Sequence, residues 1–343
     1  MSIATPRRVS AARFNRQAAT ASVVTALALL LALLVSGSAA PRVLGDPGPA
    51  VRWGLPVAVL IHHVSLSVLL GALAFTRGVL PPSVDDQQIA ARLTRVARWA
   101  AATWSGAAAA VLLLGFADTI GRPLALGFPW GDLGVYAWET SPGRARVAVL
   151  AVALAVLVLL LWRCAGDAHL VALTLAASTV VPLSQDGHAL SSHNPLAPGL
   201  LAGHVLGVAV WTGGVLVLGL LSGLLHPHGT ASNHLVATFR RFSHLAGAAF
   251  ALVFATGVAS AALRIGSPDA LASAYGALVL AKTAAMLGLG LIGYRHRRWI
   301  TSALRADSSP SAPAWRLITV EILVMGATMA LAVALGSTAP PAA

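Results

Sequence analysis

The chain has 343 residues, of which 57% are hydrophobic and only 10% are charged, and its formal net charge is +12 at pH 7. Soluble domains carry roughly 25% charged residues, so this composition excludes a soluble globular protein. The positive charge does not indicate nucleic-acid binding, because in a membrane protein arginines gather in the loops on one side of the bilayer.

Nine hydrophobic runs of about twenty residues each predict transmembrane helices. They lie near residues 20–38, 56–76, 99–117, 146–163, 168–185, 199–224, 242–263, 275–294 and 315–336. Each run is long enough to cross a hydrocarbon core of roughly 30 Å, and none shows the alternation typical of barrel strands. The sequence therefore predicts an all-α, polytopic membrane helical bundle that forms a single membrane domain over residues 1–343.

The first run follows four arginines and precedes Ser38-Ala39-Ala40, a weak match to a signal-peptide cleavage site. Its apolar core exceeds the 7–15 residues that are usual for a signal peptide. We therefore favour a retained first helix, with cleavage as the alternative.

Arginines divide unequally between the two sides of the predicted bundle. If the N-terminus is cytoplasmic, sixteen arginines fall on the inner side and six on the outer side, and the only lysine, Lys282, lies within the eighth run. This split follows the positive-inside rule. It predicts a multi-pass protein of the cell inner (cytoplasmic) membrane, with a cytoplasmic N-terminus and an outer C-terminus. The expected surroundings are the lipid bilayer, without nucleic acid.

Residues 1–145 hold the N-terminal spans and two longer loops. The outer loop at 119–145 is rich in aromatic residues, which prefer the headgroup level, so we expect it to lie on the membrane like a lid. The inner loop at 77–98 carries an amphipathic stretch that predicts a short surface helix ahead of the third span. Five tryptophans near span ends are expected to sit at the membrane interface: Trp53, Trp99, Trp162, Trp299 and Trp315.

Five of the eleven histidines converge on the outer leaflet. At 1.5 Å per residue, His62 and His63 lie about 10 Å below the outer end of the second span, and His204 about 7 Å below that of the sixth. His188 and His193 belong to the outer loop just before the sixth span. Ionisable groups within a membrane are costly and mark functional sites, so the cluster predicts a metal or cofactor site. For each histidine alone, a buried imidazole bonded to a carbonyl is the simpler interpretation.

Adjacent helical residues point about 100° apart, so His62 and His63 are not expected to serve one mononuclear site together. His63 is the preferred ligand and His62 the alternative. Asp186, beside His188, is expected to orient the imidazole or to bind metal itself. Imidazole suits copper, zinc, iron and nickel alike, so ligand type leaves the metal open.

Two charged residues lie inside the later spans. Lys282 is expected either to gate or charge-balance a metal path, or to extend its ammonium outward to the interface. Glu321 is expected to pair with Lys282 or with an inner arginine such as Arg241 or Arg316.

Sulfur contributes little to the predicted site. Cys164 is the only cysteine, so a site built on paired thiolates is excluded. Met325 and Met329 share a helical face, which predicts core packing. Trp211 is expected to fill the bundle centre beside glycines that allow close helix contact, with a direct copper contact as a minor alternative.

An ordered set of motifs runs through the C-terminal half. It comprises Gly187-His188-Ala189, His204, Trp211-x-Gly213-Gly214, Arg241-Phe242-Ser243, Arg264-x-Gly266, Tyr275-Gly276, Leu280-Ala281-Lys282, Arg316 and Glu321. This set resembles the copper resistance D (CopD) family of bacterial inner-membrane proteins. The resemblance covers roughly residues 185–338 as a CopD-like core, while the first four spans resemble the family in hydropathy and in His62-His63.

The resemblance implies a copper-binding membrane protein that transports copper across the cytoplasmic membrane, with uptake as the expected direction. A separate periplasmic or other extracytoplasmic copper-binding protein is the implied partner. One alternative is a membrane b-type cytochrome in which His63 and His204 bind haem b. Another is a factor that delivers copper for oxidase assembly. No hydrolytic constellation or phosphate-binding loop occurs in the sequence, so we do not expect an enzyme.

Overall fold

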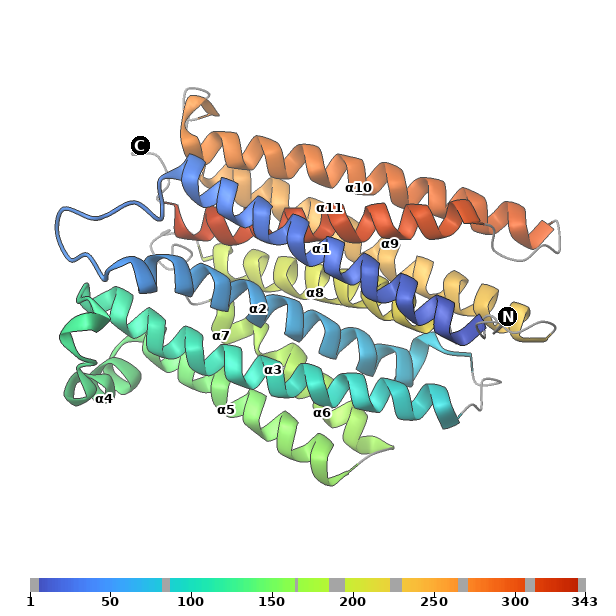
Figure 1. The fold of residues 1–343 in the computed structure, drawn as a ribbon, viewed down its shortest axis with the longest axis horizontal. Helices are drawn as coiled ribbons and strands as arrows, with labels where there is room; N and C mark the ends of the chain where they lie inside the picture. The colour runs from blue at the N-terminus through green and yellow to red at the C-terminus, as the bar shows by residue number, and fades with distance from the viewer. Residues whose placement is uncertain are drawn as a thin grey trace, which may run out of the picture.

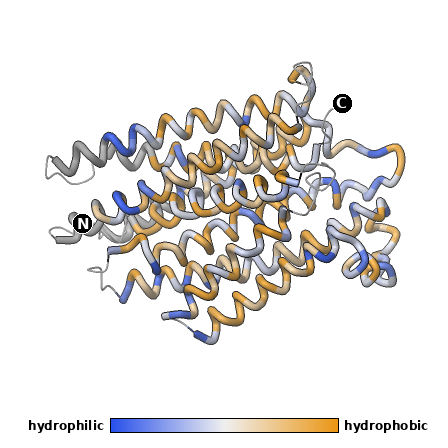
Figure 2. The backbone as a smooth tube through the Cα atoms, turned by 180° about the vertical axis from the view of Figure 1, so that it is seen from behind, coloured by the Kyte–Doolittle hydropathy of each residue, from blue (hydrophilic) through white to orange (hydrophobic). Residues whose placement is uncertain are grey.

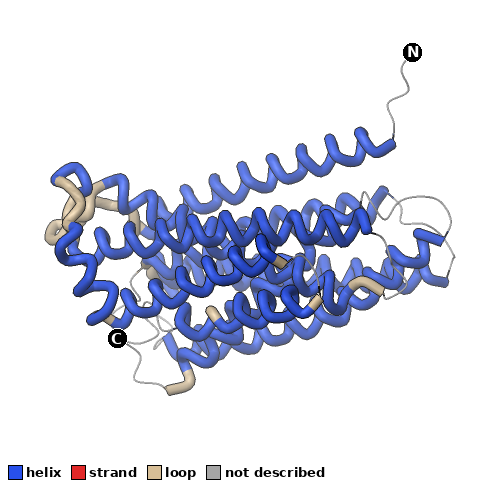
Figure 3. Tube along the Cα trace, turned by 90° about the horizontal axis from the view of Figure 1, so that it is seen from below, coloured by secondary structure: helices blue, strands red, loops and turns tan. Residues whose placement is uncertain are grey.

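A computed structural model describes residues 6–81, 87–163, 166–184, 195–222, 230–264, 271–305 and 312–338. Over these ranges the chain forms helices and loops, and no strand (Figure 3). The α-helices are α1 Pro6–Ser36, α2 Pro49–Ala74, α3 Gln87–Ile120, α4 Trp130–Glu139, α5 Ser141–Trp162, α6 Asp167–Ser178, α7 Val180–Ser184, α8 Ala197–Ser222, α9 Thr230–Arg264, α10 Ala274–Arg305 and α11 Ala312–Ser337. A π-helical turn, Phe75–Val79, extends α2, and a short 3₁₀ turn, Leu124–Leu126, precedes α4.

The predicted membrane bundle is confirmed. Within the described ranges, nine helical segments are long and apolar enough to cross a membrane. The fifth consists of α6 and α7, which are interrupted at Thr179, shortly before Pro182, a residue that cannot donate a helical hydrogen bond. The prediction of a separate surface helix ahead of the third span is wrong, because α3 runs unbroken from Gln87 to Ile120.

The long helices lie side by side along the length of the molecule (Figure 1). The start of α1 lies at one end of the bundle, hereafter the N-terminal end, whereas α4 and the last turn of α11 lie at the other, the α4 end. Polar residues gather towards these two ends and apolar residues fill the middle (Figure 2). This distribution is the one that a bilayer requires of a spanning bundle.

The aromatic loop predicted as a lid contains the short helix α4. Trp130 and Trp138 are 67% and 68% exposed, whereas Tyr136 is buried. Phe128 packs against Trp130 and Phe116, with ring centroids 4.3 and 5.3 Å apart. The loop is therefore anchored by one set of aromatic rings and presents another set outward.

Helix α2 lies at the centre and packs most extensively against α3 and α8. At the contact with α8, a Cβ on Gly213 would overlap the carbonyl of Ser67, and one on Gly71 would overlap the backbone of Gly213. Only glycine permits this approach of the two backbones, as small residues do between membrane helices.

The glycine contact also sets the relative height of two histidines. Helices α2 and α8 both run from the α4 end towards the N-terminal end (Figure 1). His63 precedes Gly71 by eight residues and His204 precedes Gly213 by nine. At 1.5 Å per residue these separations are about 12 and 13.5 Å, so the two histidines lie at nearly the same level of the bundle.

Candidate metal site

A cavity of about 660 Å³ lies in the centre of the bundle and extends to the α4 end. Its wall brings together four of the residues singled out from the sequence, namely His62, His63, His204 and Lys282. Trp211 and Glu321 line a different cavity. The three remaining candidates, Asp186, His188 and His193, lie outside the described residues.

His204 is held by α9 through one ring nitrogen. Its Nδ1 lies 3.1 Å from the carbonyl oxygen of Val253 and 3.1 Å from Oγ1 of Thr256. Because a carbonyl oxygen only accepts, Nδ1 carries the proton and Nε2 keeps a lone pair at the cavity. Gly257 leaves room for the ring, since a Cβ there would approach Cε1 to 3.3 Å. A histidine oriented by a backbone carbonyl in this way is typical of metal ligands.

His62 and His63 differ sharply in their surroundings. The indole Nε1–H of Trp104 donates to Nε2 of His62 over 2.9 Å, so this lone pair is already used. The His63 ring lies edge-on to the His62 ring, with centroids 5.3 Å apart. Among the described residues, the His63 ring has no hydrogen-bonding partner, and it is only half-buried on the cavity wall. The geometry thus favours His63 as a ligand, in line with the preference drawn from the sequence.

Two methionines line the same cavity, although the sequence assigned them no chemistry. Met286 lies one turn beyond Lys282 on α10, and Met329 comes from α11. Both are buried. The four-residue spacing from Lys282 was the available signal for Met286, because residues four apart share a helical face. The cavity therefore offers thioether sulfur as well as imidazole nitrogen.

Lys282 is half-buried and lines the same cavity as His204. The two roles that the sequence leaves open for Lys282, a charge beside a metal path and an ammonium that extends to the interface, remain predictions.

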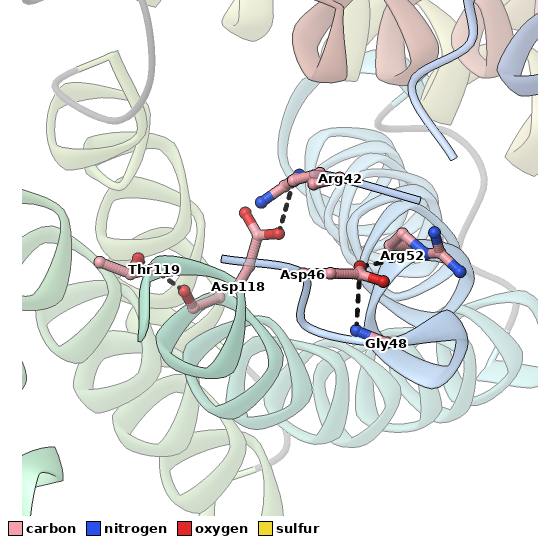
Figure 4. A network of polar contacts seen from close by, with 7 residues as sticks. Arg42, Asp46, Gly48, Arg52, Asp118 and Thr119 are labelled. Carbon is pink, nitrogen blue, oxygen red and sulfur yellow. Dashed lines mark hydrogen bonds and ion pairs between the residues drawn. The ribbon is translucent and has the colours of Figure 1, made fainter. Parts of the chain in front are cut away.

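Ion pairs surround the cavity at the α4 end (Figure 4). Arg42 donates to Asp118 of α3 over 2.8 Å, and Arg52 of α2 lies 3.5 Å from Asp46. Arg146 of α5 donates to the hydroxyl of Tyr136 in α4. These contacts join the loop before α2 to α2 and α3, and join α4 to α5, and the carboxylates offset part of the positive charge at this end.

Glu321 does not have the partners expected from the sequence. Its carboxylate lies 2.8 Å from Nδ1 of His296, so the expected pairing with Lys282 or Arg241 is wrong. Arg241 instead donates to the carbonyl of Leu80 over 3.4 Å. The side chain of Arg316 lies outside the described residues. The sequence assigned His296 no role, although α10 and α11 are consecutive antiparallel spans in which His296 and Glu321 lie at one level.

Two family models match the chain. One, described as copper resistance protein D, matches residues 236–335. The other, described as copper resistance protein D-like, N-terminal domain, matches residues 49–196. The chain belongs to the copper resistance protein D family.

Membership of this family confirms the resemblance seen in the ordered motifs. The N-terminal match adds residues 49–196, where the sequence resembled the family in hydropathy and in His62-His63. His204 and Trp211 lie between the two matched ranges. No curated protein and no solved structure matches the chain. The nine apolar helices and the family together describe a multi-pass membrane protein of copper resistance.

Proposed function

We propose that this protein transports copper across the cytoplasmic membrane and binds the ion within the bundle through His63 and His204. The observation that carries the proposal is the tether of His204, whose Nδ1 is held by Val253 and Thr256 while Nε2 remains available at a cavity shared with His63. The carbonyl fixes the orientation of the imidazole, so the ring does not have to reorient when it binds a metal.

The chemistry of the cavity favours Cu(I) as the transported ion. Thioether ligands select Cu(I), and imidazole accepts copper in either oxidation state. Met286 and Met329 supply the thioethers on the same wall as His63 and His204. We therefore assign the cargo as Cu(I).

Uptake is the direction that the resemblance to the copper resistance D family implies, and the arginine distribution orients the bundle for it. The positive-inside rule assigns the N-terminal end to the cytoplasm, so the cavity extends to the outer face of the bundle. Copper would enter there from a separate extracytoplasmic copper-binding protein. The sequence predicts that His188, His193 and Asp186 lie in the outer loop before the sixth span, and we propose that they receive the ion.

A haem-binding electron carrier is the second candidate function. The observation that favours it is the nearly equal height of His63 and His204, relative to the Gly71–Gly213 contact, beside a cavity of about 660 Å³. Two imidazoles facing each other at one depth are the axial pair of a b-type haem. Under this alternative the purified protein is red and shows a haem absorption spectrum.

Metal content and visible spectrum of the purified protein test both functions. The copper proposal expects bound copper, a spectrum without haem bands, and loss of that copper in His204→Ala. Cells expressing His204→Ala should also accumulate less copper than wild-type cells at equal protein level. His244→Ala, which changes an exposed histidine on α9, is the matched control and should behave as wild type. Haem bands, or unchanged copper content in both His63→Ala and His204→Ala, would refute the proposal.

A further inference from the structure

The part of the central cavity at the α4 end contains an arginine that the copper site does not use. Arg52 lies in the first turn of α2 and lines the cavity of about 660 Å³. It precedes His63 by eleven residues, or about three helical turns, so the two side chains lie on one face of α2. At 1.5 Å per residue, Arg52 lies about 16.5 Å from His63, towards the α4 end.

The guanidinium of Arg52 is buried without a hydrogen-bonding partner. Its side chain is 9% exposed, and neither Nε nor Nη1 has an acceptor among the described residues. The carboxylate of Asp46 lies 3.5 Å from Nε, and its same oxygen accepts from the amide of Gly48 over 3.2 Å. The guanidinium extends past Asp46 (Figure 4). Buried donors without an acceptor are costly, so a ligand that accepts hydrogen bonds would be stabilised here.

The charge of the cavity wall favours an anion as that ligand. Among the described residues that line the cavity, four side chains are cationic and one is a carboxylate: Arg42, Arg52, Arg146 and Lys282, and Asp118. The carboxylate of Asp118 already accepts from Arg42 over 2.8 Å. A copper ion bound at His63 and His204 would add a further positive charge inside the bundle, where charge is costly. An anion in the same cavity would offset it.

A glycine keeps a second guanidinium at this wall. A Cβ on Gly115 of α3 would overlap the guanidinium of Arg146, which reaches across from α5. The same guanidinium donates to the hydroxyl of Tyr136 in α4. The lack of a side chain at position 115 therefore allows this positive charge to lie beside the cavity, where it adds to the attraction for an anion.

We propose that Arg52 binds a small monovalent anion, a carboxylate or a halide, which enters the cavity from the α4 end and acts as counter-charge to the copper ion. Because the Arg52 side chain is buried, the ligand is a free ion and not a side chain of a partner protein. The second part of the inference rests on the proposed copper transport. Across about 16.5 Å, at an effective dielectric constant of about 20, the attraction between the two ions changes affinity about fivefold. Each ion should strengthen binding of the other by the same factor.

Thermal unfolding of the copper-free, full-length protein in detergent tests the anion site alone. Sodium formate and sodium chloride are titrated separately, while a bulky organic sulfonate keeps the ionic strength constant. The melting temperature of the wild type should rise saturably with at least one of the two anions, because a ligand that binds only the folded state stabilises it. The rise should be lost in Arg52→Gln. It should persist in Arg122→Gln, which changes an exposed arginine at the same end of the bundle.

The two anions distinguish the sources of the charge. A saturable rise with formate alone supports a carboxylate ligand, a rise with chloride alone supports a halide, and a rise with both supports a site that accepts either. A wild type without a saturable rise overturns the anion site, even if Arg52→Gln does not fold. A folded Arg52→Gln protein with the wild-type rise overturns it as well.

Anaerobic Cu(I) titration against a chromophoric chelator tests the counter-charge role separately. Formate is the probe, because chloride itself binds Cu(I) in solution. Formate should tighten Cu(I) binding to the wild type about fivefold and should have no effect on Arg52→Gln. A wild type that binds no Cu(I) refutes the proposed copper transport but leaves the anion site intact. A saturable melting shift with formate, without any change in Cu(I) affinity, overturns the counter-charge role.

Discussion

The indole of Trp104 on α3 donates its Nε1–H to Nε2 of His62 on α2, over 2.9 Å, and both side chains are buried. Because of this bond, the two adjacent histidines differ in their contacts. His62 fastens α2 to α3, whereas the ring of His63 lies half-buried at the cavity. Loss of the Trp104 bond and loss of the His63 ring should therefore have different measurable effects.

Trp104→Phe should destabilise the protein and leave its copper content unchanged. The substitution removes the only donor that the structure gives to Nε2 of His62, and a buried polar atom without a partner costs about 1–3 kcal/mol. Thermal unfolding in detergent measures the first effect and metal analysis the second. His63→Ala should show the reverse, with copper lost and the melting temperature little changed. Copper loss in Trp104→Phe at an unchanged melting temperature contradicts the assignment.

Thr256→Val should weaken copper binding at the site of His63 and His204 by about tenfold, because loss of one group that orients a metal-binding histidine typically costs 10–100-fold. The Val253 carbonyl still holds Nδ1 of His204, so the low end of this range applies. Thr328→Val is the matched control. Thr328 lines the same cavity but donates only to the carbonyl of Val324 within its own helix. Equal affinities in the two variants would show that Thr256 does not orient the site.

Met286→Leu should lower Cu(I) affinity by about tenfold or more and leave Zn(II) affinity unchanged, since the thioether is the soft ligand. Leucine nearly conserves the volume, so the stability should change by less than about 1.5 kcal/mol. Met325→Leu provides the control, because Met325 is buried in the core and does not line the cavity. Competition titrations with both metals measure the difference. A parallel loss of Cu(I) and Zn(II) affinity would indicate a packing defect instead.

Lys282→Met should tighten copper binding by about tenfold, equal to about 1.4 kcal/mol. Lys282 lines the same cavity as His204, so its ammonium should repel a cation bound there, and its removal lifts this repulsion. The same variant should release copper more slowly. Weaker binding in Lys282→Met would mean that the ammonium orients the site and does not oppose the ion.

Gly213→Ala should lower both stability and copper affinity. A Cβ there overlaps the carbonyl of Ser67, so α8 must move away from α2 and carry His204 from His63. Overpacking of this kind typically costs 1–3 kcal/mol. Gly288→Ala is the control, because a Cβ on Gly288 meets nothing within 4 Å. A Gly213→Ala protein with wild-type melting temperature and affinity would disprove the close helix contact.

The sequence predicted the bundle because the length of a hydrophobic run can be read from neighbouring residues alone. It also separated His62 from His63, since the 100° step of a helix is fixed. It placed Trp162 at a span end, and this residue is the last of α5 and 83% exposed. The expected outer position of His188 and His193 remains a prediction.

Other contacts depend on which helices become neighbours, and no local pattern encodes that choice. The tether of His204 joins positions 49 residues apart, and the Trp104 bond joins positions 42 apart. For Glu321 the sequence predicts either Lys282 or an inner arginine as the partner. The structure instead gives it His296, which lies at the same level on the adjacent helix.

The crossing of α2 and α8 at Gly71 and Gly213 also works as a fulcrum. Bulky side chains are missing there, so the two backbones approach closely, and a tilt of one helix against the other would pivot at this contact. His204 lies about 13.5 Å along the lever arm at 1.5 Å per residue, so a tilt of roughly 5° displaces it by about 1 Å. Such a displacement is large compared with the tolerance of a metal–ligand bond, which is about 0.2 Å. Under the proposed function, a small tilt of one helix would be enough to bring the two imidazoles into, or out of, binding distance of an ion.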